Sequence, residues 1–421
     1  MKRILKIIES KKVLFKNFTS LSILQLSNYI FPIITLPYLV RILGPEKYGL
    51  VNFATAFAAY FTIITDYGFN LSATQEISVN RENPNRISEI FSSVFTLKML
   101  LFLFSSVIFS GIILFVPIFN ENIVLFIVTF FSVLGTALFP LWFYQGMERM
   151  KYILIISVSV RFVTTILIFV IVNTESDFIK YAGLNTITHF VIGIIGLQFA
   201  LNKFGLKYSL PSQTLIKQQL KNGWNLFLST VWINLYTTSN VFILGLFAPA
   251  NVVGYYAAAD KIRIAFQGVL SSMSQSVFPY VNKLLSESYE KFINFNRKLF
   301  KIAAVVGAII SFLLFLFAEI LVNIILGQEY QQSILVLRII AWLPLVIFLS
   351  NVLGIQTMLP LNKHKSFSTI LFIAATINLT LSFILVPMYS EIGTAISVLS
   401  TETFVTIAFY SFIRFNKVKI L

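Results

Sequence analysis

Long stretches of apolar residues without a single charge recur along the whole chain. They occupy residues 17–40, 99–120, 122–147, 222–259, 339–362 and 366–390. A helix needs about 20 apolar residues to cross the roughly 30 Å hydrocarbon core of a bilayer. Stretch 222–259 is too long for one crossing and contains Pro249, so we interpret it as a helix, a turn and the start of a second helix. The pattern predicts a polytopic membrane protein built from helices.

The full pattern predicts about twelve transmembrane helices and an all-α fold. The first apolar segment runs on through Pro32 and Pro37 without a cleavage pattern, so we expect a retained first helix rather than a signal peptide. The predicted spans are 17–40, 48–70, 92–116, 123–144, 152–173, 179–200, 223–247, 252–278, 302–325, 334–358, 366–386 and 392–413.

Composition and charge agree with this prediction. Charged residues make up 12% of the chain and mean hydropathy is +0.84, whereas a soluble domain has about 25% charged residues. The net charge of +15 could indicate nucleic-acid binding, but the positions of the charges indicate otherwise. With twelve spans, 24 of the 32 Lys and Arg residues fall on one side and 3 on the other. The positive-inside rule therefore predicts that both termini are cytoplasmic, with no nucleic-acid partner.

The chain divides near its middle. Residues 201–222 are the longest candidate linker, which predicts two six-helix bundles, 1–210 and 211–421. A turn with Pro45 and Gly49 follows the first predicted helix, and a turn with Pro249 and Gly254 follows the seventh. Matching turns in six-helix halves indicate parallel repeats related by an axis along the membrane normal. The alternative is that Pro and Gly simply recur in turns between helices.

Several classes of chemistry find no support in the sequence. Cysteine is absent, which excludes disulfides, cysteine-ligated zinc and thiol nucleophiles. We find no P-loop, no H-E-x-x-H and no G-x-S-x-G motif with plausible partners. The predicted outer connections are short and leave little room for an extramembrane catalytic site. We therefore expect a protein that is not an enzyme, without catalytic residues, cofactor or metal.

Ionisable residues at membrane depth are functional candidates because burying them in lipid costs several kcal/mol. Arg161 lies near the middle of the fifth predicted span, and Asp260, Lys261 and Arg263 lie in the eighth. Asp260 and Arg263 are three residues apart and can pair, but one acid cannot neutralise two bases. The cationic surplus suits an anionic substrate, and we assign all four residues to substrate binding. The alternative for the eighth span is a self-neutralised pair beside a lysine that snorkels to the interface.

Other polar residues complete the candidate set. Glu402, His189 and Asp66 could carry a coupling ion, since a desolvated acid or a histidine can titrate near neutrality. The alternative is a hydrogen-bonded structural residue for Glu402 and His189, and an interfacial position for Asp66. Amides and aromatic rings suit a sugar surface, although they also serve as interhelical glue. To substrate binding we therefore add Asn28, Trp232, Asn234, Tyr236 and, from the first outer turn, Arg41.

Two segments resemble a known family. Residues 36–49 read LPYLVRILGPEKYG and residues 66–78 read DYGFNLSATQEIS, both similar to opening signatures of Wzx-type O-antigen flippases, the polysaccharide transporters of the MOP superfamily. Segments 142–148, 253–261 and 278–280 look similar to later parts of that family. The resemblance covers essentially the whole chain. The family often has an acid where Asp260 stands, whereas the positions of Lys261 and Arg263 vary.

The resemblance implies a fold and a task. The fold is two six-helix bundles around a central cavity, as in MATE transporters. The task is moving undecaprenyl-diphosphate-linked oligosaccharide from the inner to the outer leaflet of the bacterial cytoplasmic membrane, by alternating access and with proton or sodium coupling. A polysaccharide polymerase and a chain-length regulator are the partners it implies. Two alternatives stay open: a cation-coupled drug exporter of the MATE type, which predicts an anionic interior, and an oligosaccharide polymerase.

Overall fold

The computed structural model describes the backbone of residues 2–416 and the side chains beyond residue 18, apart from those of residues 225, 229, 269, 272, 273, 275, 276 and 279. Helices are the regular elements throughout the described part of the chain, as the apolar pattern predicts. Short 3₁₀ and π turns are labelled η. In chain order the elements are α1 (Lys2–Asp66), α2 (Phe69–Val79), α3 (Pro84–Phe115), η1 (Pro117–Phe119), α4 (Ile123–Leu138), α5 (Leu141–Gly146), α6 (Met150–Ile171), η2 (Glu175–Asp177), α7 (Phe178–Phe204), α8 (Gln213–Phe247), α9 (Ala250–Glu287), α10 (Tyr289–Leu316), α11 (Ala318–Leu321), η3 (Val322–Leu326), η4 (Gln328–Tyr330), α12 (Ser333–Ile340), α13 (Leu343–Leu353), η5 (Gly354–Met358) and α14 (His364–Phe415).

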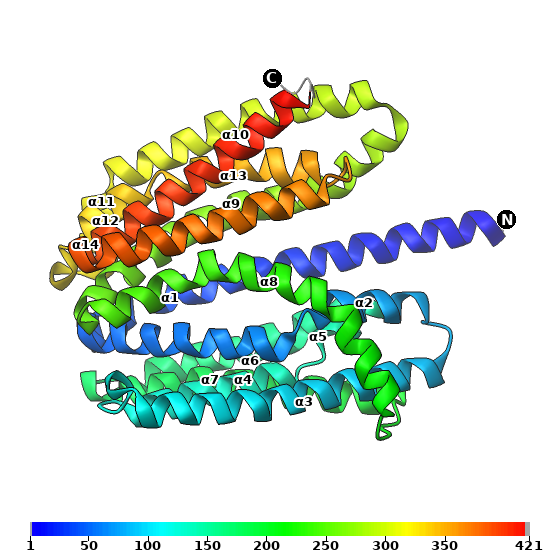
Figure 1. Ribbon diagram of the computed structural model, residues 1–421, viewed down its shortest axis with the longest axis horizontal. Helices are drawn as coiled ribbons and strands as arrows, with labels where there is room; N and C mark the ends of the chain where they lie inside the picture. The colour runs from blue at the N-terminus through cyan, green and yellow to red at the C-terminus, as the bar shows by residue number, and fades with distance from the viewer. Residues whose placement is uncertain (1, 417–421) are drawn as a thin grey trace. The chain divides into compact units, whose positions relative to one another are not determined.

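Two of these helices double back on themselves. α1 contains Gly44 with φ of 64° and α14 contains Ser390 with φ of 47°, so each is two helices joined by one residue with left-handed φ. Figure 1 shows α14 reversing direction at one end of the molecule. Within residues 19–416, nine helices are long and apolar enough to cross a membrane, and the α1 and α14 hairpins are two of the nine. Counting both arms of each hairpin, and α9, is consistent with the predicted twelve spans.

Prolines divide two of the predicted spans. The span predicted at 123–144 is α4 followed by α5, with Pro140 between them. The span predicted at 334–358 is α12 and α13, and Pro344 occupies the first turn of α13. A proline lacks the amide hydrogen that a helix interior needs, so the helix restarts at each one. These breaks were not in the predicted boundaries.

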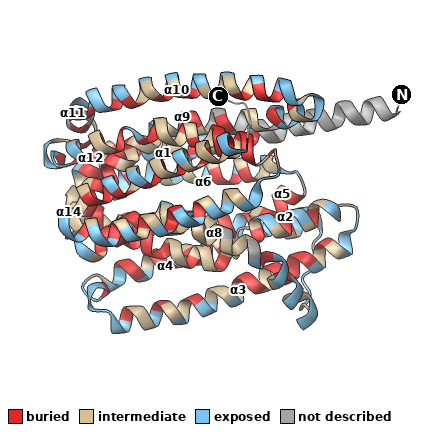
Figure 2. Cartoon of the chain, turned by 45° about the horizontal axis from the view of Figure 1, so that its top comes forward, coloured by how far each residue is buried: buried red, intermediate tan, exposed pale blue. Residues whose placement is uncertain are grey.

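The exposed face of α10 carries large side chains and its buried face carries small ones. On α10 the exposed stripe is large and apolar, with Val305, Ile309 and Phe312 each more than half exposed. The buried stripe of the same helix is small, with Gly307 and Ser311 inside. Figure 2 shows the two stripes along α10 as exposed and buried turns. Small residues let membrane helices approach closely, while large apolar residues face the lipid.

The packing divides the chain into two compact units. Unit 1 is Met1–Phe31 with Ala54–Val231, and unit 2 is Pro32–Phe53 with Trp232–Leu421. Two helices, α1 and α8, pass from one unit to the other, and Pro32 stands where α1 first does so. These two helices also carry the amide and aromatic candidates Asn28, Trp232, Asn234 and Tyr236. The predicted division into bundles 1–210 and 211–421 remains a prediction.

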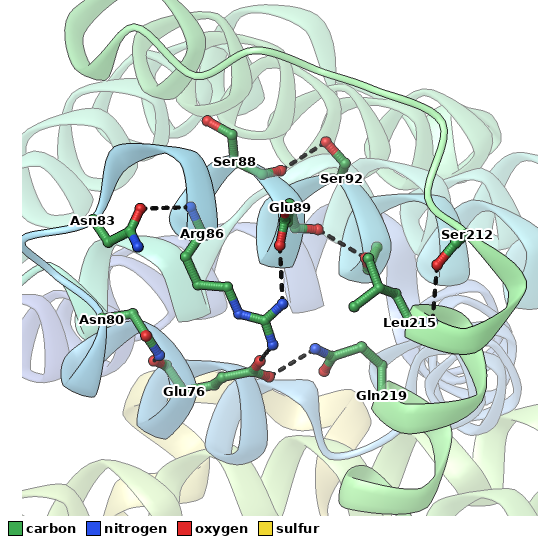
Figure 3. Close-up of polar contacts among 11 residues, drawn as sticks. Glu76, Asn80, Asn83, Arg86, Ser88, Glu89, Ser92, Ser212, Leu215 and Gln219 are labelled. Carbon is green, nitrogen blue, oxygen red and sulfur yellow. Dashed lines mark hydrogen bonds and ion pairs between the residues drawn. The ribbon is translucent and has the colours of Figure 1, made fainter.

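In unit 1, a polar network attaches the start of α8 to α2 and α3 (Figure 3). Glu76 accepts a hydrogen bond from Arg86 at 2.9 Å and another from Gln219 at 2.7 Å. Ser88 and Ser92 on α3 bond to the backbone of the linker at residues 207 and 209. The linker predicted at 201–222 is therefore held to unit 1, and α8 starts from a fixed position there.

Candidate functional site

The first cluster of predicted site residues lies in unit 1. Arg161 stands half-way along the 22 residues of α6, and its Nη1 donates a hydrogen bond to Oδ1 of Asn28 on α1. No ion pair of Arg161 occurs among the residues that the structure describes. A guanidinium cannot be deprotonated in a protein, so this position keeps a positive charge that a neutral amide holds in place. The structure joins two residues that lie 133 positions apart in the sequence.

His189 on α7 belongs to the same cluster. It lies close enough to Arg161 for the guanidinium charge to act on it. Its Nδ1 lies 2.8 Å from the carbonyl oxygen of Asn185, one turn earlier on the helix. A carbonyl oxygen only accepts, so Nδ1 carries the hydrogen and Nε2 of the neutral ring is an acceptor. The cluster therefore offers cationic donors from Arg161 and an acceptor from His189.

The second cluster lies in unit 2 and is centred on Arg263 of α9. Its Nε donates to Oδ1 of Asp260 at 2.7 Å, which is the pairing that the spacing of three residues predicts. Its Nη1 donates to Oε1 of Gln267, one turn further along the helix. Sequence reasoning missed Gln267, although its spacing of four residues from Arg263 was a usable signal. Arg263 is thus fixed by partners on both sides.

The fold adds a second acid to this cluster and corrects the charge estimate made from α9 alone. Glu402 of α14 is 9% exposed and lies within electrostatic range of Arg263. Asp260 and Glu402 therefore balance Lys261 and Arg263 when both carboxyls are ionised. The surplus cation counted on α9 alone is therefore offset within this cluster, whereas Arg161 in unit 1 forms no ion pair with the residues that the structure describes.

The aromatic and amide candidates of α8 have mixed surroundings. Trp232 packs edge-on against Phe372, with ring centroids 4.6 Å apart. Tyr236, one turn later, lies within electrostatic range of Glu402 and so belongs to the Arg263 cluster. Asn234, between them in sequence, is half buried. The structure therefore brings Tyr236 to the charged candidates.

Asp66 and Arg41 lie outside both clusters. Asp66, at the end of α1, pairs with Lys98 of α3 in unit 1 at 2.7 Å, and Lys98 is only 2% exposed. Arg41 belongs to unit 2, where its Nη2 donates to the carbonyl oxygen of Ile324 in the π turn η3. Asp66 thus sits in an ion pair with a buried lysine, and Arg41 holds backbone at the end of the α1 hairpin.

The chain matches known proteins along most of its length. The family described as "Polysaccharide biosynthesis protein" matches residues 14–285. A putative O-antigen transporter of Escherichia coli (strain K12) is 36% identical over 408 residues, which cover 97% of this chain and 98% of that protein.

Two solved structures share the fold at low sequence identity. One is a multidrug resistance transporter of the MATE family and the MOP superfamily, with a TM-score of 0.74 and 13% identity over 94% of this chain and 98% of that chain. The other is the lipid II flippase MurJ, with a TM-score of 0.71 and 13% identity over 96% of this chain and 87% of that chain. Both similarities show a MATE-like fold, as the sequence motifs imply.

Proposed function

Because the chain belongs to the polysaccharide biosynthesis protein family, we propose that it flips a lipid-linked oligosaccharide across the bacterial cytoplasmic membrane. The proposed substrate is a repeat unit on undecaprenyl diphosphate, and the proposed direction is from the inner to the outer leaflet. The family match and the O-antigen transporter similarity support a polysaccharide precursor as the cargo. The proposed carrier, direction and coupling ion are argued from the residues of the site.

The observation that carries the proposal is the unbalanced cation at Arg161. A diphosphate headgroup cannot enter hydrocarbon unless other groups replace its water. Arg161 has a fixed fork of donors that matches phosphate oxygens, and it has no carboxylate ion-pair partner in the described chain. Asn28 and the Nε2 of His189 add an amide and an acceptor for sugar hydroxyls. The apolar prenyl tail needs no such site and can stay in lipid.

The unit 2 cluster differs in charge balance and suits a second role. Glu402 and Tyr236 lie beside Arg263, and the cluster becomes net positive only when a carboxyl is protonated. We assign proton coupling to Glu402, with His189 as the corresponding group of unit 1. Asp260, Lys261 and Arg263 then attract the anionic headgroup when protonation of a carboxyl leaves the cluster net positive. An inside-negative potential favours outward movement of the anionic headgroup by roughly 2.3 kcal/mol per charge per 100 mV.

The test of the proposal is substitution of Arg161 in a strain that depends on this protein for surface polysaccharide. Arg161→Ala should abolish surface polysaccharide and cause lipid-linked repeat units to accumulate. Arg161→Lys keeps the charge but loses the fork, so it should transport weakly. The matched control is Arg338→Ala, which removes an exposed membrane arginine paired with Glu319 at 3.5 Å. Normal polysaccharide in Arg161→Ala cells, with the protein present in the membrane, would reject the site.

Two rival functions make different predictions in the same deletion strain. A drug exporter of the MATE type predicts drug accumulation on deletion, with surface polysaccharide intact. A polymerase predicts single repeat units still displayed on the surface, whereas loss of a flippase leaves none. Partner proteins such as a polymerase and a chain-length regulator would then act after this protein, on its product.

A further inference from the structure

Two glycines of unit 2 meet in a reciprocal contact between helix backbones. A Cβ atom added to Gly49 would lie 1.8 Å from the carbonyl oxygen of Ala250, and one added to Gly254 would lie 2.0 Å from that of Pro45. Pro45 precedes Gly49 by four residues, and Ala250 precedes Gly254 by four. Each glycine thus packs against the carbonyl oxygen of the residue that lies four positions before the other glycine. We call these four residues the glycine crossing.

The crossing has the sequence pattern of a membrane helix pair in direct contact. A small residue, three others and a second small residue form one face of a helix and let two backbones touch. At the start of α9 the two small residues are Ala250 and Gly254, whereas in the α1 hairpin Gly49 is the small residue and Pro45, four positions earlier, contributes its carbonyl oxygen. The neighbouring residues Tyr48, Val51 and Val253 are each at most 3% exposed. Backbones in contact with buried flanks leave no room for water between them.

A directed hydrogen bond holds the α1 hairpin next to the crossing. Arg41 lies on the helical arm that leads into the hairpin, and its Nη2 donates to the Ile324 carbonyl. In a π turn such as η3 each backbone hydrogen bond spans five residues rather than the four of an α-helix, and such turns often mark a functional position. The contact at Arg41 is a single charge-assisted bond, which can break without leaving an acid unpaired. The glycine crossing itself consists of two glycines, an alanine and a proline, so opening it exposes no charged side chain.

We propose that the glycine crossing seals the outer end of the transport path in this state of the protein and that Arg41 is the latch of the seal. Opening then separates the α1 hairpin from the start of α9, breaks the bond to Ile324 and exposes residues that were in contact. The proposal rests on the proposed transport function and on the predicted orientation, which places both turns on the outer side. It gives Arg41 a role in the gate rather than in headgroup binding.

The test uses the absence of cysteine from the chain. Val253→Cys introduces a single thiol that is 1% exposed beside the crossing. A membrane-impermeant maleimide added to intact cells should label this thiol slowly. Adding Gly49→Ala should make labelling several-fold faster, because the new methyl group cannot fit against the Ala250 carbonyl. The matched control is Gly111→Ala on α3, where an added Cβ meets nothing within 4 Å and labelling should not change.

Arg41→Ala provides a second route that leaves both glycines in place, in case a glycine variant fails to reach the membrane. It should also speed labelling several-fold, and Arg41→Lys should have a smaller effect. Unchanged labelling in Gly49→Ala and Arg41→Ala would overturn the seal. Faster labelling that occurs only in inverted vesicles, in which the reagent reaches the cytoplasmic face, would overturn the assignment of the seal to the outer end.

The labelling result and the transport result can fail separately. Labelling requires no substrate, so it reports on the seal even if the cargo is misidentified. Loss of polysaccharide in Arg41→Ala cells with unchanged labelling would return Arg41 to substrate binding and reject the latch. A normal polysaccharide phenotype in a deletion strain would reject the proposed function, while faster labelling in Gly49→Ala would still support the crossing as a gate.

Discussion

The Nζ atom of Lys98 lies 2.7 Å from Oδ1 of Asp66, and the lysine side chain is almost completely buried in unit 1. Oδ2 of the same carboxylate accepts a hydrogen bond from Asn70 at 3.3 Å. Removing one partner of a buried pair leaves an uncompensated charge, which costs about 3–5 kcal/mol. The pair therefore connects α3 to the end of α1. Asp66 can thus be a structural partner of Lys98 or an ion-coupling group, two roles that the sequence alone could not separate.

The first prediction distinguishes those roles. Lys98→Met alone should lower the thermal stability of the detergent-solubilised protein, because the Asp66 carboxylate, which is only 24% exposed, is left charged without its cation. Adding Asp66→Asn should recover most of the lost stability. If the double variant is stable and still supports surface polysaccharide, Asp66 has a structural role. A stable double variant without transport would instead assign ion coupling to Asp66.

The second prediction concerns the partner of Arg161. Asn28→Asp keeps a hydrogen-bond acceptor in place but adds a charge that cancels the guanidinium. Transport of an anionic headgroup should then fall severely, whereas Asn28→Ser, which stays neutral, should transport substantially better. Surface polysaccharide measured at equal protein level decides the point. Equal activity of the two variants would contradict a role for the unbalanced cation in binding the headgroup.

The third prediction concerns Glu402. Glu402→Gln is close to the same size and cannot exchange a proton, so Arg263 and Lys261 face one acid instead of two. Proton-coupled flipping should be strongly reduced, and the remaining export should no longer respond to the pH of the medium. His189→Gln provides the comparison in unit 1. Export in Glu402→Gln cells with an unchanged pH response would exclude Glu402 as the coupling group.

The fourth prediction concerns the turn between α1 and α2. Gly68 has φ of 73°, and an added Cβ would lie 2.9 Å from the backbone nitrogen of Phe227 on α8. Gly68→Ala therefore combines about 1–2 kcal/mol of backbone strain with a clash. Gly205→Ala is the control, since its φ is 61° and an added Cβ meets nothing within 4 Å. Melting temperature should fall clearly further for Gly68→Ala than for Gly205→Ala.

The fifth prediction tests orientation. Lys180 lies at the start of the predicted span 179–200, at its predicted outer end, and its side chain is 62% exposed. A single cysteine at this position should react with an impermeant maleimide added to intact cells. A single cysteine at Lys365, in a predicted inner loop, should react only in inverted vesicles. The opposite pattern would place both termini outside and would put the glycine crossing at the inner end of the transport path.

The elements were predictable because they depend on local properties. Hydropathy over about 20 residues decides whether a segment can cross a bilayer, and this is readable without any tertiary contact. The Asp260–Arg263 pair was predictable for the same reason, since both residues lie on one turn of one helix. The breaks at Pro140 and before Pro344 were missed, although proline was visible at both places, because an apolar run around a proline resembles one continuous span.

The charge balance of the site was not predictable from one helix. Asp260, Lys261 and Arg263 by themselves carry a surplus cation, and only the packing of α14 against α9 within unit 2 brings Glu402 within electrostatic range of Arg263. Arg161 stands out in the sequence as a charge in the middle of an apolar span, but its amide partner Asn28 is 133 positions away. Electrostatic balance at a site depends on distances in space, which sequence separation does not encode.

The sequence by itself determined that this is a multi-pass helical membrane protein of the polysaccharide biosynthesis family, because hydropathy and the motifs are carried by contiguous residues. Only the tertiary structure decided which charges stand alone and which are paired. Arg161 keeps its charge beside a neutral amide, Arg263 is balanced by acids from two helices, and Arg41 holds a carbonyl of a distant turn. The reason is that an ion pair or a backbone contact forms between neighbours in space, and folding chooses those neighbours.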